Sequence, residues 1–264
     1  MQDDQTICST DLSINQLKER IIQRPSLNEA EIELLQRDPR SGVRELLSSY
    51  LRLRERDEKK KVRLHKMGQR ERELQAQGYE LVAGIDEAGR GPLAGPVVAA
   101  AVVLSQRNDS LWQELNDSKK LLPTTRERLF ELLASEATAI AVGIVDHAVI
   151  DHMNIHHASL EAMRLAVRQL YPQPHYLLCD GFAIPRMRLP QEGIKGGDAC
   201  CLSIAAASIV AKVIRDRIMN GFHTLYPDYG FSRHKGYPTH LHHEALRLHG
   251  PSPLHRCSFK WGGA

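Results

Sequence analysis

Two short apolar runs, residues 81–85 and 97–104, enclose a connection rich in glycine and proline, and this arrangement limits the fold most strongly. Both runs contain β-branched residues and have the length of buried strands. Pro92 and Pro96 disfavour a helix between them, because proline lacks the backbone N–H that a helix interior needs. The segment therefore predicts strand, turn, strand, and two strands joined in this way must pair antiparallel.

Two adjacent carboxylates, Asp86 and Glu87, stand where the first strand ends. Burying unpaired charge costs several kcal/mol, so these groups need a compensating partner. A divalent cation is one candidate, and the neighbouring Gly89 and Gly91 would let a substrate backbone come close. A charged strand end followed by a polar turn is the plainer alternative, and this segment alone does not decide between the two.

Three glycines of the connection, Gly89, Gly91 and Gly95, match a nucleotide-binding fingerprint only loosely, because the third lies one position late. A dinucleotide loop must also open a helix, whose N-terminus holds the pyrophosphate. This connection opens a strand instead, which argues against a dinucleotide-binding fold.

Strands and helices alternate in the rest of this region. Further strands are expected at residues 139–145 and 176–179, and the second delivers Asp180 at its carboxyl end. Residues 181–197 are rich in proline, glycine and arginine, and we interpret them as a loop that leads to Asp198. The alternation predicts an α/β sandwich.

Helices are expected between and after these strands. The pattern Thr124-x-x-Glu127 predicts a capping box at the start of one helix, and Asn154 is predicted to cap another. Residues 203–222 combine an apolar stripe with several small residues, which predicts a helix that packs closely against the sheet. A last short helix is expected at residues 241–248.

The N-terminal part of the chain contains no strand-like run. Helices are expected at residues 11–23 and 27–37, and a third runs into the densely charged residues 52–61. That run is either a solvated helix with i,i+4 ion pairs or a basic arm that contacts phosphates. We therefore divide the chain into a helical N-terminal extension, residues 1–78, and a main domain, residues 79–264.

Composition limits the cellular setting. Hydrophobic residues make up 42% and charged residues 25% of the chain, as in soluble globular proteins, and the net charge of +3 is compatible with a polyanionic partner. No apolar run has the length of a membrane span, and the polar, acidic start differs from a secretion signal. With no Cys-x-x-Cys pair, we expect reduced thiols in a cytoplasmic protein. The cysteines are Cys8, Cys179, Cys200, Cys201 and Cys257.

Histidines gather in two places along the main domain. They have no acidic or cysteine partner at metal-ligand spacing, so we interpret them as surface or loop residues. These histidines are His152, His156, His157, His240, His242 and His243.

Four acidic residues stand out: Asp86 and Glu87 at one strand end, Asp180 at another, and Asp198 before a helix. Oxygen ligands of this kind suit Mg²⁺ or Mn²⁺ better than Zn²⁺. Two such ions, roughly 3.5–4 Å apart, can clamp the attacking and leaving oxygens of a phosphodiester displacement. The spacing in sequence leaves open whether the four side chains meet.

Five segments in order resemble the motifs of bacterial ribonuclease HII, and the similarity covers about residues 79–259. The first two are Gly-Ile-Asp-Glu-Ala-Gly-Arg-Gly-Pro at 84–92 and Asp-Ser-Lys at 117–119. The others are Cys-Asp-Gly at 179–181, Ser-Ile-Ala-Ala-Ala-Ser-Ile-Val-Ala-Lys at 203–212 and His-Lys-Gly-Tyr at 234–237.

The resemblance implies a ribonuclease H-like fold, in which a mixed five-stranded sheet is flanked by helices, here preceded by a small helical N-terminal region. It also implies an endonuclease that hydrolyses the RNA strand of RNA–DNA hybrids and cuts on the 5′ side of single ribonucleotides embedded in duplex DNA. The products would carry 3′-hydroxyl and 5′-phosphate ends. Two divalent ions, Mg²⁺ or Mn²⁺, are expected in each site.

The resemblance assigns the catalytic and metal-binding roles to Asp86, Glu87, Asp180 and Asp198. The family usually has Lys-Gly-Asp or Lys-Ala-Asp before the fourth carboxylate, whereas residues 195–198 read Lys-Gly-Gly-Asp. The additional glycine makes the placement of that carboxylate a question for the structure. Asp216 is the competing acid, but it stands between two arginines, so we interpret it as part of a structural ion pair.

Substrate recognition is assigned by the same resemblance. Gly89, Arg90 and Gly91 would recognise the 2′-hydroxyl through backbone groups, since that hydroxyl alone distinguishes RNA from DNA at one position. Lys119 would hold a phosphate near the cut. Tyr237 would stack against the sugar of the next deoxynucleotide and so sense the change from RNA to DNA.

Two alternatives stay open at this point. Ribonuclease HIII is a related enzyme that typically has Gly-Thr-Gly where this chain has Gly-Arg-Gly at 89–91, and it carries a different N-terminal domain. A non-catalytic hybrid-binding protein would use the groove and the charged extension only for binding. The expected partner is an RNA–DNA hybrid or a ribonucleotide-containing DNA duplex, without membrane or protein partners, and the chain is expected to act as a monomer with an N-terminal extension that could add to substrate binding.

Overall fold

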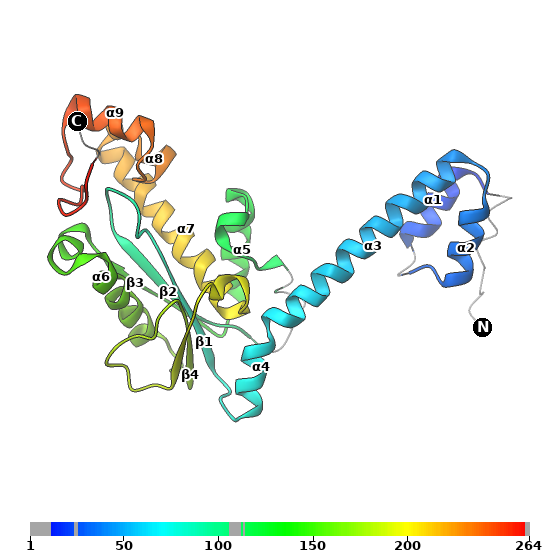
Figure 1. The fold of residues 1–264 in the computed structure, drawn as a ribbon, viewed down its shortest axis with the longest axis horizontal. Helices are drawn as coiled ribbons and strands as arrows, with labels where there is room; N and C mark the ends of the chain where they lie inside the picture. Colours follow the sequence, from blue (N-terminus) through cyan, green and yellow to red (C-terminus); the bar gives the residue numbers. More distant parts are fainter. Residues whose placement is uncertain (1–11, 24–25, 106–111, 113, 262–264) are drawn as a thin grey trace. The chain divides into compact units, whose positions relative to one another are not determined.

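A computed structural model describes residues 12–23, 26–105, 112 and 114–261 of the protein (Figure 1). The chain divides into two compact units between Arg63 and Leu64. Cys8 and the first residue of the helix expected at 11–23 lie outside the described residues.

The N-terminal unit consists of helices α1 (Ile14–Gln23) and α2 (Glu29–Arg37) and most of α3 (Ser41–Met67). Asn28 caps α2 because its side chain accepts a hydrogen bond from the Glu31 N–H at 2.9 Å, while the Glu31 carboxylate accepts one from the Asn28 N–H at 3.0 Å. The predicted helices are therefore confirmed for the described residues. Their buried faces form a small apolar core of Leu17, Ile21, Leu27, Leu35, Val43 and Leu47.

Helix α3 continues through the charged run, as predicted. Lys59 pairs with Glu55 at 2.6 Å and Lys61 pairs with Glu58 at 2.9 Å, and all four side chains are largely exposed. Exposed pairs of this kind contribute at most about 1 kcal/mol each, so the run is a solvated helix whose lysines can exchange these partners for phosphates.

The larger unit is built on a mixed five-stranded sheet with the strand order β3-β2-β1-β4-β5. Strand β1 (Val82–Ala88) pairs antiparallel with β2 (Val97–Val103), as predicted, and β2 pairs antiparallel with β3 (Ala139–Val145). On the other side, β1 pairs parallel with β4 (Tyr176–Asp180), which pairs parallel with β5 (Gln191–Ile194). This is the sheet that the resemblance implied.

Helices cover both faces of the sheet (Figure 1). Ala99, Ala101 and Val103 of β2 pack toward α6 (His147–Gln169), whereas Ala100 and Val102 pack toward α7 (Leu202–Leu225). The second face also receives α5 (Pro123–Glu136). Because successive strand side chains point to opposite faces, a strand covered on both sides must be apolar throughout, as the β2 sequence is.

Helix α7 lies unusually close to β1 at Gly84. A Cβ atom at this position would come within 2.0 Å of the Ser203 carbonyl carbon, so only glycine allows this approach. The small residues at the start of α7, which predicted close packing, are buried against the sheet. The close approach holds α7 beside the carboxyl end of β1.

Several predicted details are wrong. Strand β5 lies inside the segment that we interpreted as a loop. Its sequence, Gln-Glu-Gly-Ile, has only one apolar residue, so it lacks the pattern of a buried strand and suits a short strand at the edge of a sheet. The capping box at Thr124 does not form, since Pro123 is already the first residue of α5 and Leu122 precedes it.

Helix α6 begins earlier than predicted. Asp146 caps its first segment, and the helix is interrupted at Asn154, where φ is 67°. The Asn154 side chain accepts hydrogen bonds from the His156 and His157 N–H groups at 3.0 and 3.1 Å. Its predicted capping role is thus confirmed for the second segment.

The remaining elements after β1 in the described part of the larger unit are four short helices and one final helix. They are the short helices η2 (Ser118–Lys120), η3 (Gly197–Ala199), η4 (Pro227–Tyr229) and α8 (Phe231–His234), and the final helix α9 (His240–His249). Among the helices that the structure describes, none combines the length and apolar character needed to cross a membrane.

Within the larger unit, two residues of helix α4 (Gln69–Ala76) form polar contacts with β5 and α7. Arg70 donates to Glu192 of β5 at 2.5 and 3.0 Å. The buried Glu71 accepts hydrogen bonds through Oε1 from the Ser203 N–H at 2.9 Å and from its hydroxyl at 2.8 Å. Glu71 therefore satisfies a backbone donor in the first turn of α7, where helices leave N–H groups unpaired.

We expect Glu71→Ala to lower the free energy of unfolding by about 1–3 kcal/mol, because the Ser203 donors would stay buried without a partner. Glu73→Ala, on the exposed side of the same helix, is the matched control and should change it by no more than about 0.5 kcal/mol. Urea unfolding of the two variants measures the difference. Equal losses would show that Glu71 does not cap α7.

Candidate active site

The parallel pairing of β1 and β4 brings Asp86 and Asp180 together. Ile85 pairs with Cys179 in this register, so the two aspartates follow at neighbouring positions on the same face of the sheet. Strand β1 also continues past the predicted end, because Asp86, Glu87 and Ala88 still pair with β2. The carboxylates thus belong to the strand itself and are held by its hydrogen bonds.

Asp86 is 5% exposed. Its Oδ1 accepts a hydrogen bond from the Glu87 N–H at 2.7 Å, and the Ser208 hydroxyl, which is hydrogen-bonded to the Ser118 hydroxyl at 2.7 Å, opposes the rise in its pKa. Burial, together with repulsion from Glu87 and Asp180, raises the pKa of Asp86 well above its ordinary value. The protein alone does not compensate the charge at this position.

Glu87 is paired on one side only. Its Oε1 accepts a hydrogen bond from Arg90 at 3.0 Å, while its Oε2 is buried and has no hydrogen-bond partner among the described residues. Burial raises the pKa of Glu87, and the Arg90 guanidinium opposes that rise. One carboxylate oxygen is therefore free to bind a cation.

The additional glycine before Asp198 has a defined place. Gly196 has φ 68°, and the Gly197 N–H that follows donates to Asp180 Oδ1 at 2.8 Å. This turn leads directly into η3, where Asp198 is buried and its Oδ2 lies 3.7 Å from Lys119 Nζ. Burial raises the pKa of Asp198. Repulsion from Asp117 and, to a smaller extent, from Asp180 adds to this rise.

A cleft of about 340 Å³ gathers most of the predicted residues. Asp198 is not one of its lining residues but contacts Lys119, which is. Ser208 and Lys212 of α7 also line it and were not predicted, although a serine within a buried apolar helix face was a signal. The predicted residues that line the cleft are Asp86, Glu87, Gly89, Arg90, Gly91, Lys119, Asp180 and Tyr237.

Tyr237 lines the cleft and has 38% of its surface exposed. Lys212 Nζ and the Arg215 guanidinium each lie 5.8 Å from the centre of its ring. Gly91 is its neighbour, since a Cβ atom there would meet only Tyr237 Cε1, at 3.8 Å. The space beside the ring is therefore open.

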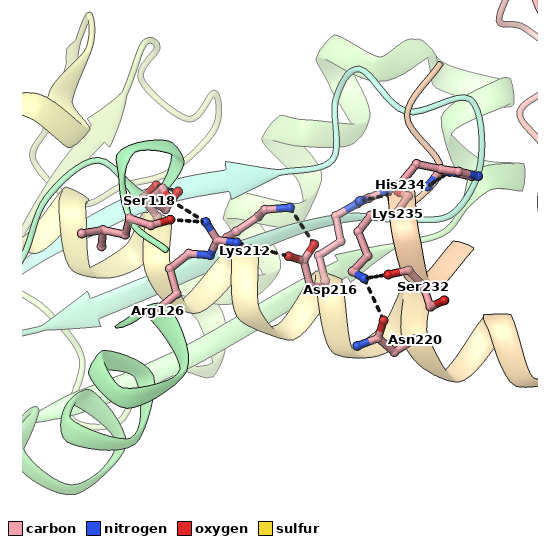
Figure 2. Close-up of polar contacts among 12 residues, drawn as sticks. Ser118, Arg126, Lys212, Asp216, Asn220, Ser232, His234 and Lys235 are labelled. Atoms are coloured by element: carbon pink, nitrogen blue, oxygen red, sulfur yellow. Dashed lines mark hydrogen bonds and ion pairs between the residues drawn. The ribbon is translucent and has the colours of Figure 1, made fainter. Parts of the chain in front are cut away.

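Asp216 forms the structural ion pair that we predicted (Figure 2). Its carboxylate lies 2.6 Å from Lys212 Nζ and 4.0 Å from Arg126 Nη2. Arg126 in turn donates to the carbonyl groups of Ser118 and Leu121, at 2.9 and 2.8 Å (Figure 2). Asp216 thus links α7 to the turn that carries Lys119, and it does not line the cleft.

Comparison with known proteins identifies the family. The family model for ribonuclease HII matches residues 83–261, and the model for the ribonuclease HII N-terminal domain matches residues 13–75. This chain belongs to the ribonuclease HII family. Members of the family are endonucleases that act on the RNA of RNA–DNA hybrids and need divalent metal ions.

Relatives with this name span nearly the whole chain. It is 49% identical to ribonuclease HII of Pelotomaculum thermopropionicum over 253 residues, which cover 94% of each chain. Ribonuclease HII of Geobacillus thermodenitrificans is 49% identical over 227 residues, or 86% of each chain. The family models and these relatives favour ribonuclease HII over ribonuclease HIII.

Solved structures show the same fold. The crystal structure of ribonuclease H2 from Pyrococcus horikoshii OT3 matches with a TM-score of 0.59 and 28% identity, covering 69% of this chain and 94% of that chain. Ribonuclease HII in the PCNA complex from Archaeoglobus fulgidus matches with a TM-score of 0.58 and 26% identity, covering 70% and 97%. A ribonuclease HIII in complex with Mn²⁺ shares only the fold, at 18% identity and a TM-score of 0.50.

The donor set of this ribonuclease HII site fits divalent metal ions. As the side chains stand, no three carboxylate, imidazole or thiol groups within the described parts of the chain converge on one point. Rotation of the side chains is therefore needed before they share an ion. The free Glu87 Oε2 and the uncompensated Asp86 supply hard oxygen ligands, which Mg²⁺ and Mn²⁺ prefer.

The interpretation of the histidines is wrong for one residue. His152, His156, His157 and His240 are exposed, as predicted, but His242 is fully buried. Its Nε2 lies 2.9 Å from Nε2 of His255, and burial lowers the pKa of both rings to about 4. These two rings therefore form a neutral hydrogen-bonded pair inside the C-terminal part of the unit.

Two alanine substitutions distinguish an effect on substrate binding from an effect on the stability of the fold. Gly91→Ala should leave the thermal unfolding temperature unchanged but lower kcat/KM on an RNA–DNA hybrid by about tenfold or more, because its methyl group would occupy the open space beside Tyr237. Gly89→Ala should instead destabilise the fold by about 2 kcal/mol or more. Gly89 has φ 101°, and a Cβ atom there would lie 2.1 Å from Arg215 Nε. A fully active Gly91→Ala enzyme would contradict this assignment.

Proposed function

We propose that this member of the ribonuclease HII family cuts duplex DNA on the 5′ side of single embedded ribonucleotides, in addition to the RNA strand of hybrids. Its products would carry 3′-hydroxyl and 5′-phosphate ends. The observation that carries this proposal is that three of the carboxylates, the Gly-Arg-Gly segment at 89–91 and Tyr237 line one cleft. The three carboxylates belong to Asp86, Glu87 and Asp180. A single ribose could therefore be recognised next to the groups that act on its phosphate.

Recognition of that ribose is assigned to backbone groups of Gly89, Arg90 and Gly91. The 2′-hydroxyl is the one group that distinguishes RNA from DNA at a single position. Gly91 supports this role because the space beside it is open, so a sugar can come close to the main chain.

Tyr237 and Lys119 are assigned to the flanking nucleotides. The exposed ring of Tyr237 offers a flat surface on which the deoxyribose of the next nucleotide can stack. Burial lowers the pKa of Lys119, but its acidic neighbours, first among them Asp198, outweigh burial and raise the pKa overall. Lys119 is thus kept protonated and can bind a phosphate near the cut.

The metal ligands are assigned to Asp86, Glu87, Asp180 and Asp198. When bound, two Mg²⁺ or Mn²⁺ ions would supply an activated water nucleophile and would stabilise the leaving 3′-oxygen. The chain itself buries Asp86, orients it through the Glu87 N–H and orients Asp180 through the Gly197 N–H. These second contacts keep the acceptor oxygens in place before any ion arrives.

A duplex with one ribonucleotide tests the proposed function. With Mg²⁺ or Mn²⁺ present, the enzyme should cut once, 5′ to the ribose, and mapping of both product ends should give a 3′-hydroxyl and a 5′-phosphate. Activity confined to long RNA tracts would contradict the proposal and favour a ribonuclease HIII-like enzyme.

The variant Asp180→Asn separates catalysis from binding. It keeps the oxygen that accepts from Gly197, so hybrid binding in Ca²⁺ should survive, while cleavage should fall by about 100-fold or more. Asp216→Asn is the matched control and should fall by less than about tenfold, because its carboxylate lies outside the cleft. Full cleavage by Asp180→Asn would refute the metal-site assignment and favour a different set of acids.

We also propose that the helical extension, residues 1–78, adds phosphate contacts. Replacing Lys59, Lys60 and Lys61 together by glutamine should raise KM, leave kcat unchanged and reduce the salt slope of binding by about 0.9 for each lost contact. Lys18→Gln, an exposed lysine outside the charged run, is the control. An unchanged KM and salt slope in the triple variant would exclude this role for the run.

A further inference from the structure

Two buried arginines hold the connection between β1 and β2. Arg215 of α7 and Arg256 near the C-terminus both have 0% of their surface exposed. Neither has a carboxylate within 4.0 Å among the residues that the structure describes, and burial lowers the pKa of Arg256 to about 9 and that of Arg215 to about 10. Both stay charged at neutral pH, so each carries a desolvation cost that its hydrogen bonds must offset.

Arg256 directs its whole guanidinium at backbone carbonyl groups. Nη2 donates to the Gly89 carbonyl at 2.6 Å, Nη1 donates to the Arg90 carbonyl at 3.0 Å, and Nε donates to the Gly95 carbonyl at 3.0 Å. The guanidinium also lies 4.9 Å from the centre of the Phe259 ring. A planar fork of five donors suits this arrangement, whereas a lysine ammonium could not reach all three carbonyls.

Arg215 holds the other end of the same connection. It donates to the Ala94 carbonyl at 3.2 Å and to the Pro96 carbonyl at 2.9 Å. Its Nη1 donates to the Lys235 carbonyl at 3.0 Å, two residues before Tyr237. The connection and the segment of Tyr237 are thus fastened to one side chain.

The Arg256 contacts decide where the neighbouring amide groups point. In a planar trans peptide the carbonyl of one residue and the N–H of the next point in opposite directions. Because the Gly89 and Arg90 carbonyls face Arg256, the N–H groups of Arg90 and Gly91 point away from it. Neither N–H donates a hydrogen bond within the described part of the chain, and both residues line the cleft.

We propose that Arg256 is a positioning residue for ribose selection, because it turns the Arg90 and Gly91 N–H groups into the cleft as fixed donors for a 2′-hydroxyl oxygen. The proposal rests on the proposed function, in which this segment reads the ribose. Two donors held before binding lose little conformational freedom when the sugar arrives. A deoxyribose offers them no acceptor and leaves them unpaired.

Binding to two duplexes of one sequence, with and without a single ribonucleotide, tests the proposal in Ca²⁺, where hybrid binding is measured without cleavage. The full-length wild type should prefer the ribonucleotide duplex. Arg256→Met and Arg256→Lys should reduce that preference by about tenfold, as expected for the loss of one or two hydrogen bonds. A purely structural role would weaken both duplexes alike and leave the ratio unchanged.

Arg126→Met is the matched control, because Arg126 also donates to two backbone carbonyls but in the turn that carries Lys119. It should weaken both duplexes equally and preserve the ratio. Phe259→Leu keeps the Arg256 guanidinium but removes the ring beside it, and should lower the ratio by about threefold. If thermal unfolding shows that the Arg256 variants do not fold, the Phe259→Leu variant tests the role of Arg256 in their place.

The outcomes are distinguishable. A wild type without any preference would refute the proposed function itself. A wild type with a clear preference that the folded Arg256 or Phe259 variants retain would overturn only the role of Arg256.

Discussion

The parallel register between β1 and β4 is the constraint on which the site depends. It places Asp86 and Asp180 side by side at the carboxyl end of the sheet, under a helix that the missing side chain of Gly84 allows to come close. Burial of Asp86, together with repulsion from the carboxylates of Glu87 and Asp180, raises its pKa. The fold therefore holds buried negative charge that divalent cations can compensate. The Glu87 carboxylate oxygen that lacks a hydrogen-bond partner adds to this charge.

Buried positive charge lies against the connection that follows this acidic end of β1. Arg215 and Arg256 do not neutralise the carboxylates by direct contact; they hold the backbone of the connection that leaves β1. Strand geometry thus places the carboxylates, while arginine–carbonyl hydrogen bonds hold the backbone of the connection that follows them. Because the strand runs directly into the connection, the proposed metal ligands and the proposed recognition segment lie within a few residues of each other.

Much of this arrangement could be predicted because it is local. Apolar runs bounded by glycine and proline identified β1, β2, β3 and β4, and the two strand-end carboxylates followed from them. Local patterns failed where tertiary contacts decide. The polar sequence of β5 forms a strand only because β4 offers it an edge, and His242 is buried only because His255 and Phe231 enclose it. Ser208 looked like one small residue of an apolar helix, and only packing placed it in the cleft, with its hydroxyl 2.7 Å from the Ser118 hydroxyl.

The sequence by itself identified the candidate acidic residues, the glycine segment beside them and the family, because motif spacing along one strand and one turn is a property of the chain. The tertiary structure decided which acids share the site. It placed Asp198 beside Lys119 despite the additional glycine, and it assigned Asp216 to an ion pair with Lys212. It also brought Arg256, 167 residues away in sequence, onto the carbonyl of Gly89. The physical reason is that burial, repulsion and hydrogen bonding between distant segments exist only after the sheet and its helices have packed.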